Sequence, residues 1–219
     1  MRKCIVYGAG TYGQIYAKYL EDEYFIHGYI DDNPTLIGQT INGIKVLGNR
    51  IYSIELLKAN PDLDIFVPIG DNNLRHKLMC IYNELGFNTP SFIHKNANID
   101  NSVEIGNGVY VLPGTNIMPF TKILDYTMIS MGVNIAHHTL IEEGCFFSLG
   151  TNIGASINIR HKAYIGIAAT LMTGVKEIGA NSLIGAGSTV IRDVPENAVM
   201  IGSPARVLRY QPIPDDDIL

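Results

Sequence analysis

The chain has 219 residues, of which 47% are hydrophobic and 17% charged, and its formal net charge is −5 at pH 7. This composition is typical of a globular protein with one or two domains. The negative charge argues against a nucleic-acid-binding groove, which needs clustered lysine and arginine. No apolar run reaches the length of about 18 residues that would predict a membrane span.

The three cysteines, Cys4, Cys80 and Cys145, are odd in number and far apart in the sequence. Such spacing favours buried thiols in a reducing compartment over a disulfide framework. Gly8 and Gly10 interrupt the opening segment too early for a signal peptide. We therefore expect a cytoplasmic protein that neither spans a membrane nor binds nucleic acid.

The first 90 residues alternate between short apolar strands and amphipathic helices. Strands are expected at residues 3–7, 25–30, 44–47 and 64–69, and helices at residues 11–22, 51–59 and 74–85, with 44–47 at an edge. This alternation predicts a parallel sheet with helical crossovers, that is, a small Rossmann-like α/β domain. The pattern changes near Pro90, so we expect the domain to occupy residues 1–89.

A G-x-G-x-x-G motif, formed by Gly8, Gly10 and Gly13, follows the first predicted strand and opens the first predicted helix. Glycines in this context let backbone N–H groups and the helix N-terminus approach a phosphate. Asp31 and Asp32 follow about 20 residues later, where a carboxylate can bind a ribose. A dinucleotide needs a fold about twice this size. A nucleotide sugar is therefore favoured, with NAD or NADP and a purely structural turn as alternatives.

From residue 93 onward, every sixth residue is aliphatic or aromatic. This column consists of Ile93, Ile99, Ile105, Val111, Ile117, Ile123, Ile129, Ile135, Ile141, Phe147, Ile153, Ile159, Ile165 and Leu171, and it resumes after one extra residue at Ile178, Ile184 and Val190. A hexapeptide period is typical of a parallel β-helix, in which three short strands and three turns form one coil. We expect the column to point inward, in a β-helix domain at residues 90–209 followed by a tail at residues 210–219.

Five segments occur in one order along the chain: GAGTYGQ, FIHGYIDDNP, IGDNNLRHKL, the hexapeptide repeats and IGSPARVL. Together they resemble the PglD/NeuD-type bacterial sugar acetyltransferases over about residues 3–209. The resemblance implies a left-handed β-helix, acetyl-CoA as co-substrate, and a homotrimer with active sites between subunits. It also implies that the small α/β domain binds a nucleotide-linked sugar, with UDP as the expected nucleotide.

Site residues follow from the resemblance position by position. The implied nucleotide-sugar-binding residues are Gly8, Gly10, Gly13, Asp31, Asp32, Gly70 and Asn72, and the implied acetyl-CoA-binding residues are Ala155, Ser156, Ile167, Ala186 and Arg206. The small residues among the second set would leave backbone groups open to the pantetheine amides. Arg206 would pair with a CoA phosphate. No metal is expected.

The implied catalytic residues are His137 and His138. His137 matches the histidine that serves as the family's base, because an imidazole with an ordinary pKa of about 6.5 can accept a proton at neutral pH. The family usually has Asp or Glu directly after this histidine, where this chain has His138, and a second histidine where it has Phe146. Glu142 and Glu143 are the nearest acidic residues that could replace the missing partner.

The sequence thus predicts an acetyl-CoA-dependent N-acetyltransferase that acts on a nucleotide-linked amino sugar in surface glycan biosynthesis. The missing acidic partner favours an amine over a hydroxyl acceptor, because an amine depends less on base catalysis. O-acetylation of a sialic acid and a non-catalytic nucleotide-sugar-binding role are the alternatives, together with an NAD-linked enzyme.

Overall fold

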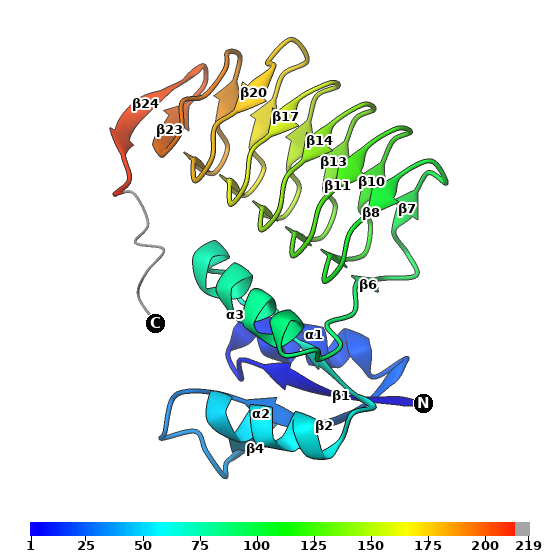
Figure 1. Ribbon diagram of the computed structural model, residues 1–219. Coiled ribbons are helices and arrows are strands. Elements are labelled where there is room, and N and C mark those ends of the chain that lie inside the picture. The colour runs from blue at the N-terminus through cyan, green and yellow to red at the C-terminus, as the bar shows by residue number, and fades with distance from the viewer. Residues whose placement is uncertain (213–219) are drawn as a thin grey trace. The chain divides into compact units, whose positions relative to one another are not determined.

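The structure is a computed structural model that describes residues 1–212. The chain divides into two compact units, Met1–Pro90 and Ser91–Leu219. Figure 1 shows an α/β unit and a stack of short strands in coils, so the predicted fold class is confirmed. Of the expected tail, Tyr210 ends the last strand and Gln211 donates its backbone N–H to the carbonyl of Asn197. Residues 213–219 lie outside the described part.

The first unit is a 5-stranded sheet with the strand order β3-β4-β2-β1-β5. Its strands are β1 (Arg2–Tyr7), β2 (Tyr24–Ile30), β3 (Thr40–Ile41), β4 (Ile44–Gly48) and β5 (Leu63–Phe66). The helices are α1 (Thr11–Leu20), α2 (Arg50–Ala59) and α3 (Asn72–Glu84). The side chain of Asn49 caps α2 and that of Asp71 caps α3, each by accepting a backbone N–H of the first turn.

Strands β1, β2, β4 and β5 pair in parallel, whereas β3 and β4 form an antiparallel hairpin. The expectation that residues 44–47 form an edge strand is wrong, because β3 covers that side. The hairpin turns at Asn42 and Gly43, both with positive φ. This is the Asn-Gly turn that suits the twist of a hairpin, and the Asn-Gly pair is the sequence signal that predicts such a hairpin.

The second unit coils through three parallel sheets. The first sheet holds β7 (Asn98–Ile99), β10 (Asn116–Ile117), β13 (Asn134–Ile135), β16 (Asn152–Ile153), β19 (Thr170–Leu171) and β22 (Thr189–Val190). The second holds β8 (Glu104–Ile105), β11 (Lys122–Ile123), β14 (Leu140–Ile141), β17 (Asn158–Ile159) and β20 (Glu177–Ile178). The third holds β6 (Phe92–Ile93), β9 (Tyr110–Val111), β12 (Met128–Ile129), β15 (Phe146–Phe147), β18 (Tyr164–Ile165), β21 (Leu183–Ile184), β23 (Ala198–Gly202) and β24 (Ala205–Tyr210), the last antiparallel to β23.

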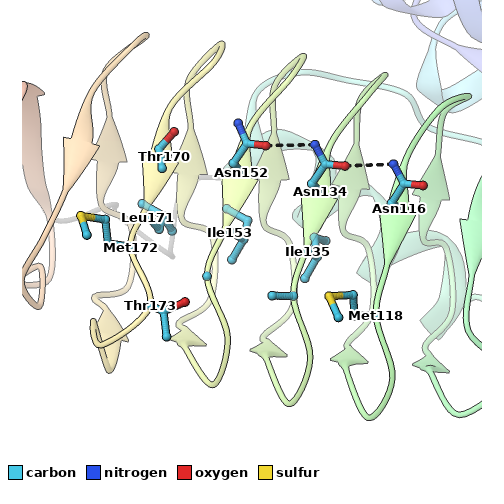
Figure 2. Close-up of a pocket in the computed structure, with 12 residues that line it drawn as sticks. Asn116, Met118, Asn134, Ile135, Asn152, Ile153, Thr170, Leu171, Met172 and Thr173 are labelled. Carbon is cyan, nitrogen blue, oxygen red and sulfur yellow. Dashed lines mark hydrogen bonds between the residues drawn. The ribbon is translucent and has the colours of Figure 1, made fainter.

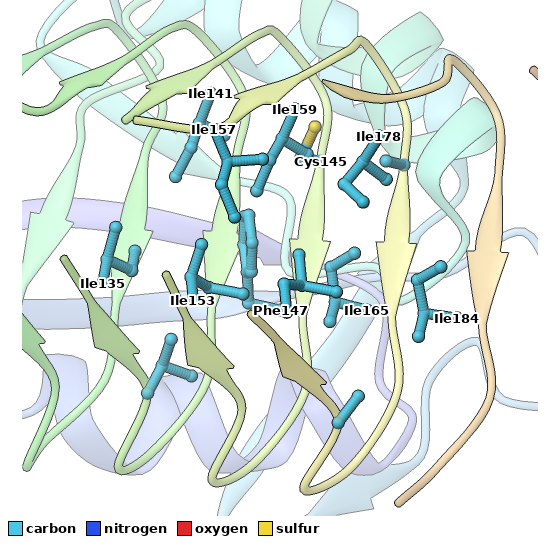
Figure 3. Packing of buried hydrophobic residues seen from close by; sticks show 14 of the residues in the cluster. Ile135, Ile141, Cys145, Phe147, Ile153, Ile157, Ile159, Ile165, Ile178 and Ile184 are labelled. Atoms are coloured by element: carbon cyan, nitrogen blue, oxygen red, sulfur yellow. The ribbon is translucent and has the colours of Figure 1, made fainter. Parts of the chain in front are cut away.

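The predicted column fills the interior of this β-helix. From Ile117 to Val190 every column residue is at most 4% exposed, and Figure 3 shows Phe147 packed among isoleucines from neighbouring coils. At the start of the column Ile93 is 41% exposed and Ile99 and Ile105 are only partly buried, because they belong to the first coil and no other coil of the β-helix precedes them. Strand pairs such as Asn116 with Asn134 keep the expected register of 18 residues. The inward direction of the column is thereby confirmed beyond its first coils.

The extra residue between Leu171 and Ile178 lengthens one coil, so that Asn158 pairs with Glu177. The chain accommodates it in the segment from Thr173 to Lys176, where Thr173 and Val175 form an isolated bridge. This longer turn emerges beside the turns that follow β13 and β16. Among residues 1–212, no helix is long and apolar enough to cross a lipid bilayer.

Candidate functional site

The glycine motif of the first unit is required by backbone geometry. Gly8 has a φ of 96° and donates its N–H to the carbonyl of Ile30 over 2.7 Å. Gly10 is the N-cap of α1. A Cβ atom on Gly13 would lie 1.7 Å from the carbonyl oxygen of Gly8, which no side chain can do. Gly8 and Gly13 therefore let the end of β1 and the start of α1 approach each other closely.

The structure brings Asp31 and Asp32 to this loop, at the end of β2. The carboxylate of Asp31 accepts the backbone N–H of Ala9 at 2.8 Å and that of Asn33 at 2.9 Å. Asp31 thus contacts the loop through Ala9, whose N–H belongs to the motif predicted to face a phosphate. Sequence reasoning missed this contact between the two halves of the predicted nucleotide site.

Asp32 joins β1 to the start of α2. Its carboxylate accepts the phenol O–H of Tyr7 and the backbone N–H of Arg50, the latter at 2.9 Å. Burial, followed by the hydrogen bond to Asp32, raises the pKa of Tyr7 far above its usual value. Tyr7 therefore remains a neutral donor at physiological pH, and Asp32 is positioned by the fold before any ligand arrives.

Asn72 is the first residue of α3, the helix that follows β5. Its side-chain oxygen accepts a hydrogen bond from Arg75 at 2.9 Å, and Arg75 also donates to the carbonyl of Ile69 at 2.7 Å. Arg75 is fully buried. Asn72 therefore helps to solvate a buried guanidinium, a contact that the sequence did not indicate. A Cβ atom on Gly70 would lie 3.1 Å from the ring of Tyr12.

The second unit holds the histidine pair in the turn after β13. The Nδ1 atoms of His137 and His138 lie 2.9 Å apart, with the two rings perpendicular. His138 has a φ of 59° and donates its backbone N–H to Pro119 one coil earlier. Its ring also contacts that of Phe120, with 4.9 Å between centroids. Both histidines are exposed.

We call the stack of turns that follow β10, β13, β16 and β19 the histidine corner. A groove runs along it, with a volume of about 810 Å³, and is lined by Met118, Ala136, His137, Ala155, Ser156, Thr173, Gly174, Val175 and Lys176. His137 thus shares one groove with two residues of the predicted acetyl-CoA set, Ala155 and Ser156. The backbone N–H of Ala155 donates a hydrogen bond to the hydroxyl oxygen of Thr173 at 3.2 Å. This N–H, which was expected to face pantetheine, therefore already has a side-chain partner. Thr173 occupies the same turn position as Ala155 one regular coil later, whereas Lys176 lies in the part of the turn that the extra residue lengthens.

The outer face of the first β-helix sheet continues this groove. Asn116, Asn134 and Asn152 form a ladder of side-chain amide hydrogen bonds at 2.9 Å, shown as dashed lines in Figure 2. Beside the ladder, a shallow pocket of about 390 Å³ is bordered by residues that include Met118 and Met172. The face combines an apolar strip with amide groups.

The remaining predicted acetyl-CoA residues lie elsewhere in the same chain. Ile167 is 53% exposed in the turn after β18, and Ala186 is exposed in the turn after β21 directly above it, where Gly187 donates its N–H to Ile167. Arg206 is on β24, and its guanidinium donates to the carbonyl of Ala205 at 2.8 Å. None of the three borders the groove with His137.

We call the stack of turns after β12, β15 and β18 the apolar corner. It exposes a row of side chains spaced one coil apart, which are Met131, Leu149 and Ile167 at 40%, 43% and 53% exposure. Apolar side chains aligned on a surface in this way are typical of a contact site for another protein chain.

Phe146 and Glu142 do not reach the histidine corner. Phe146 lies on β15 of the third sheet, is 1% exposed, and stacks on Tyr164 with 5.0 Å between centroids. Glu142 contacts the guanidinium of Arg160 at 3.0 Å and His161 at 3.5 Å, in the turn after β14. Glu143 follows Glu142 in the same turn, so both glutamate candidates lie on another corner, and His138 itself occupies the position beside His137. Within residues 1–212, no group of His, Cys, Asp and Glu is arranged to hold a metal ion.

Comparisons with known proteins agree with both units. Residues 3–82 match the family model of the PglD N-terminal domain. A variant of GDP-perosamine N-acetyltransferase from Caulobacter crescentus, solved in complex with CoA and GDP-perosamine, is 27% identical. The match covers 94% of this chain and 97% of that one, with a TM-score of 0.88. WeeI from Acinetobacter baumannii AYE is 26% identical over 95% of this chain and 100% of its own, with a TM-score of 0.86.

Curated sequences match over a shorter part. Galactoside O-acetyltransferase of Escherichia coli K12 is 41% identical over 73 residues, which are 33% of this chain and 32% of that protein. The chain therefore spans about a third of the length of the curated relatives it matches. The long matches come from the solved structures, and they include the α/β unit as well as the β-helix. This N-terminal domain and this β-helix, joined in one chain, are the combination found in the solved sugar acetyltransferases, and the chain is similar to the PglD/NeuD-type enzymes over nearly its whole length.

Proposed function

We propose that this protein transfers the acetyl group of acetyl-CoA to the amino group of a nucleotide-linked amino sugar. The observation that carries the proposal is the open groove in which His137 lies beside Ala155 and Ser156, in a chain that also has a PglD-type N-terminal domain. The structural relative that was solved with CoA and GDP-perosamine supports both substrate classes.

The chemistry needs one base and no covalent enzyme intermediate. The amine of the sugar attacks the thioester carbonyl, a C–N bond forms, and the C–S bond breaks to release the CoA thiolate. His137 accepts the proton that the amine loses and returns it to the thiolate. Because Nδ1 of His137 is bound to His138, Nε2 is the nitrogen that would act on the substrate.

Acetyl-CoA would bind through the groove and the adjacent sheet face. Met118 and Met172 offer apolar contact to the pantetheine arm, and the amides of the asparagine ladder offer hydrogen-bond partners. Lys176 adds a cation to the groove, which suits a phosphate of CoA. The nucleotide sugar would bind to the loop of Gly8 and Gly10 and to the carboxylates of Asp31 and Asp32. UDP stays our prediction for the nucleotide, and GDP is the nucleotide of the solved relative.

We propose that the active assembly is a homotrimer with active sites between subunits. The predicted acetyl-CoA residues support this assembly, because Ala155 and Ser156 lie on the histidine corner while Ile167 lies on the apolar corner. The histidine corner of one copy against the apolar corner of the next would unite them. We place the reaction in the cytoplasm, since the three cysteines, all in the described part, form no disulfide.

Release of the CoA thiol, followed with a thiol-reactive dye, tests the proposal. Purified protein and acetyl-CoA would be given UDP-, GDP- and dTDP-linked amino sugars, with sialic acid and CMP-sialic acid alongside. Turnover with an amino sugar, lost in His137→Ala, is expected. Turnover with a sialic acid alone would move the protein to O-acetylation. Nucleotide-sugar binding without turnover would point to a non-catalytic role, and near wild-type kcat of His137→Ala across pH 6–9 would remove His137 from the chemistry.

A further inference from the structure

The contact between His137 and His138 allows only certain proton arrangements. Their Nδ1 atoms are 2.9 Å apart, which is a hydrogen-bond distance. A hydrogen bond between two imidazole nitrogens needs one proton between them, so one ring donates and the other accepts. If neither Nδ1 atom carried a proton, the two lone pairs would repel each other. If both Nδ1 atoms carried a proton, the two N–H groups would repel each other.

The surroundings distinguish the two rings. His137 borders the groove along the histidine corner and His138 does not. The ring of His138 instead contacts Phe120, which comes from the same turn position one coil earlier. Both Phe120 and His138 have a φ near 60°, as does Ser156 one coil later. His138 thus contacts the tilted ring of Phe120 and the ring of His137.

We propose that His138 is a positioning residue that holds His137 in the tautomer with its proton on Nδ1. In this arrangement His137 donates to Nδ1 of His138, and Nε2 of His137 keeps a lone pair directed away from the pair. This inference rests on the proposed function, because it gives Nε2 of His137 the role of base. In the opposite tautomer a neutral His137 would carry its proton on Nε2 and could not accept another there.

The pair can carry one additional proton without losing its hydrogen bond. When Nε2 of His137 takes a proton from the substrate, Nδ1–H of His137 still donates to His138. A second additional proton, on Nδ1 of His138, would break the contact and place two like charges together. The pair therefore holds at most one additional proton at any time during turnover.

Charged groups lie in the turns on the side of the β-helix that carries the pair and on the neighbouring sheet. Lys176 lines the same groove as His137. Asp100 is in the turn after β7, two coils before the turn of His137, and accepts hydrogen bonds from Ser102. On the neighbouring sheet, Glu104 and Lys122 form an ion pair with each other at 2.8 Å. A carboxylate in place of His138 would stabilise the imidazolium of His137 by direct charge attraction, which the neutral ring of His138 does not do.

The first test measures the tautomer without any substrate. Long-range ¹H–¹⁵N correlation spectra of the intact protein at pH 8 report which ring nitrogen of His137 carries the proton, with His137→Gln used for assignment. We expect Nδ1–H in the wild type and in His138→Asn, whose side-chain oxygen can accept the hydrogen bond. His137 should lose this preference in His138→Gly. A wild-type His137 protonated on Nε2 would overturn the proposal, whether or not an acceptor sugar is known.

The second test measures kinetics with an accepted amino sugar. Gly and Asn both tolerate the left-handed backbone at position 138, so His138→Gly separates loss of the ring from backbone strain. We expect kcat to fall at least 10-fold in His138→Gly with KM little changed, and His138→Asn to restore most of it. His138→Asp should move the acid limb of the kcat/KM profile to higher pH. Lys162→Gly changes the same turn position on another corner, with a φ of 57°, and should keep wild-type kinetics.

Several results would contradict the proposal. Wild-type kcat and an unchanged pH profile in His138→Gly would remove the positioning role. An equal loss in His138→Gly and His138→Asn, with unchanged thermal unfolding, would show that the hydrogen bond is not what matters. Absence of turnover by the wild type across all acceptors would contradict the proposed function instead, and the tautomer measurement would still decide the role of His138.

Discussion

The carboxylate of Asp193 accepts the backbone N–H of Lys176 at 2.6 Å and that of Glu177 at 3.2 Å. These bonds hold the end of the turn that contains the extra residue, and this turn forms one side of the groove beside His137. The hydrogen bond from Lys176, followed by that from Glu177, lowers the pKa of Asp193 below its ordinary value of 3.8. A residue near the end of the β-helix therefore shapes the predicted acetyl-CoA site.

Asp193→Asn should weaken this support while it keeps a neutral acceptor in place. Since the pKa of Asp193 is lowered by folding, its stabilising effect is present above pH 3.8 and is lost as the pH falls through the lower folded value. Because the side chain is exposed, the effect is small, and we expect Tm at pH 7 to fall by about 2–4 °C. Calorimetry should show no difference between variant and wild type at the acid end of this window. A constant difference in Tm at every pH would contradict this account.

Gly13→Ala should unfold or loosen the α/β unit, because the added Cβ would lie 1.7 Å from the carbonyl oxygen of Gly8. We expect a loss of several kcal/mol, seen as a lower Tm and as rapid amide hydrogen exchange in β1 and α1. Gly10→Ala is the matched control, since its Cβ would meet nothing within 4 Å. It should change stability by about 1 kcal/mol or less. Equal Tm values for the two variants would show that the close approach is not needed.

Phe147→Ala should leave a cavity in the middle of the β-helix, because this ring is fully buried among aliphatic side chains. Such truncations cost about 3–5 kcal/mol. Denaturant unfolding should show this loss for the β-helix. Phe25→Ala removes a ring that is 55% exposed and should have little effect. A loss below about 1 kcal/mol in Phe147→Ala would mean that the coils collapse around the gap.

Leu149→Asp should disrupt the proposed trimer, because it places a charge in the middle of the apolar corner. We expect light scattering coupled to size-exclusion chromatography to show a mass near 24.1 kDa in place of three times that value, with a parallel loss of turnover. Leu124→Asp is the control, since Leu124 is 39% exposed in the turn after β11, away from that corner. A trimer that persists in Leu149→Asp, or a monomeric wild type, would place the contact elsewhere or exclude it.

The sequence predicted the β-helix well because the same requirement, a buried hydrophobic residue, recurs at every sixth position. Each coil packs its three column residues against the residues at the equivalent positions of the next coil. One register of strand pairing therefore buries the column in all coils. The prediction did not hold at Ile93, where the stack begins and no earlier coil covers the side chain. The α/β unit was also predicted in outline, except for the hairpin at Asn42 and Gly43, which depends on one turn rather than on a periodic pattern.

The candidate site could be predicted only in part. The repeat places His137 and Ala155 on one corner, because they are one coil of 18 residues apart. It also places Phe146 half a coil from His137, and this spacing already indicated another face of the β-helix. The hydrogen bonds of Asp31 to Ala9 and of Ala155 to Thr173 depend on rotamers and loop paths that no periodicity encodes.

The asparagine ladder has a consequence for how the molecule tolerates changes in length. Each amide contacts its counterpart in the adjacent coils, so the coils form a linear array in which every unit is joined to its nearest neighbours. Adding or removing a whole coil before β10 would leave the groove of His137 unchanged and would change only the distance between that groove and the first coil, in steps of about 4.8 Å. A change of one or two residues would instead move every later side chain out of register unless a turn absorbed it, as the turn from Thr173 to Lys176 absorbs the extra residue. The β-helix thus behaves as a spacer whose length can change only in discrete increments.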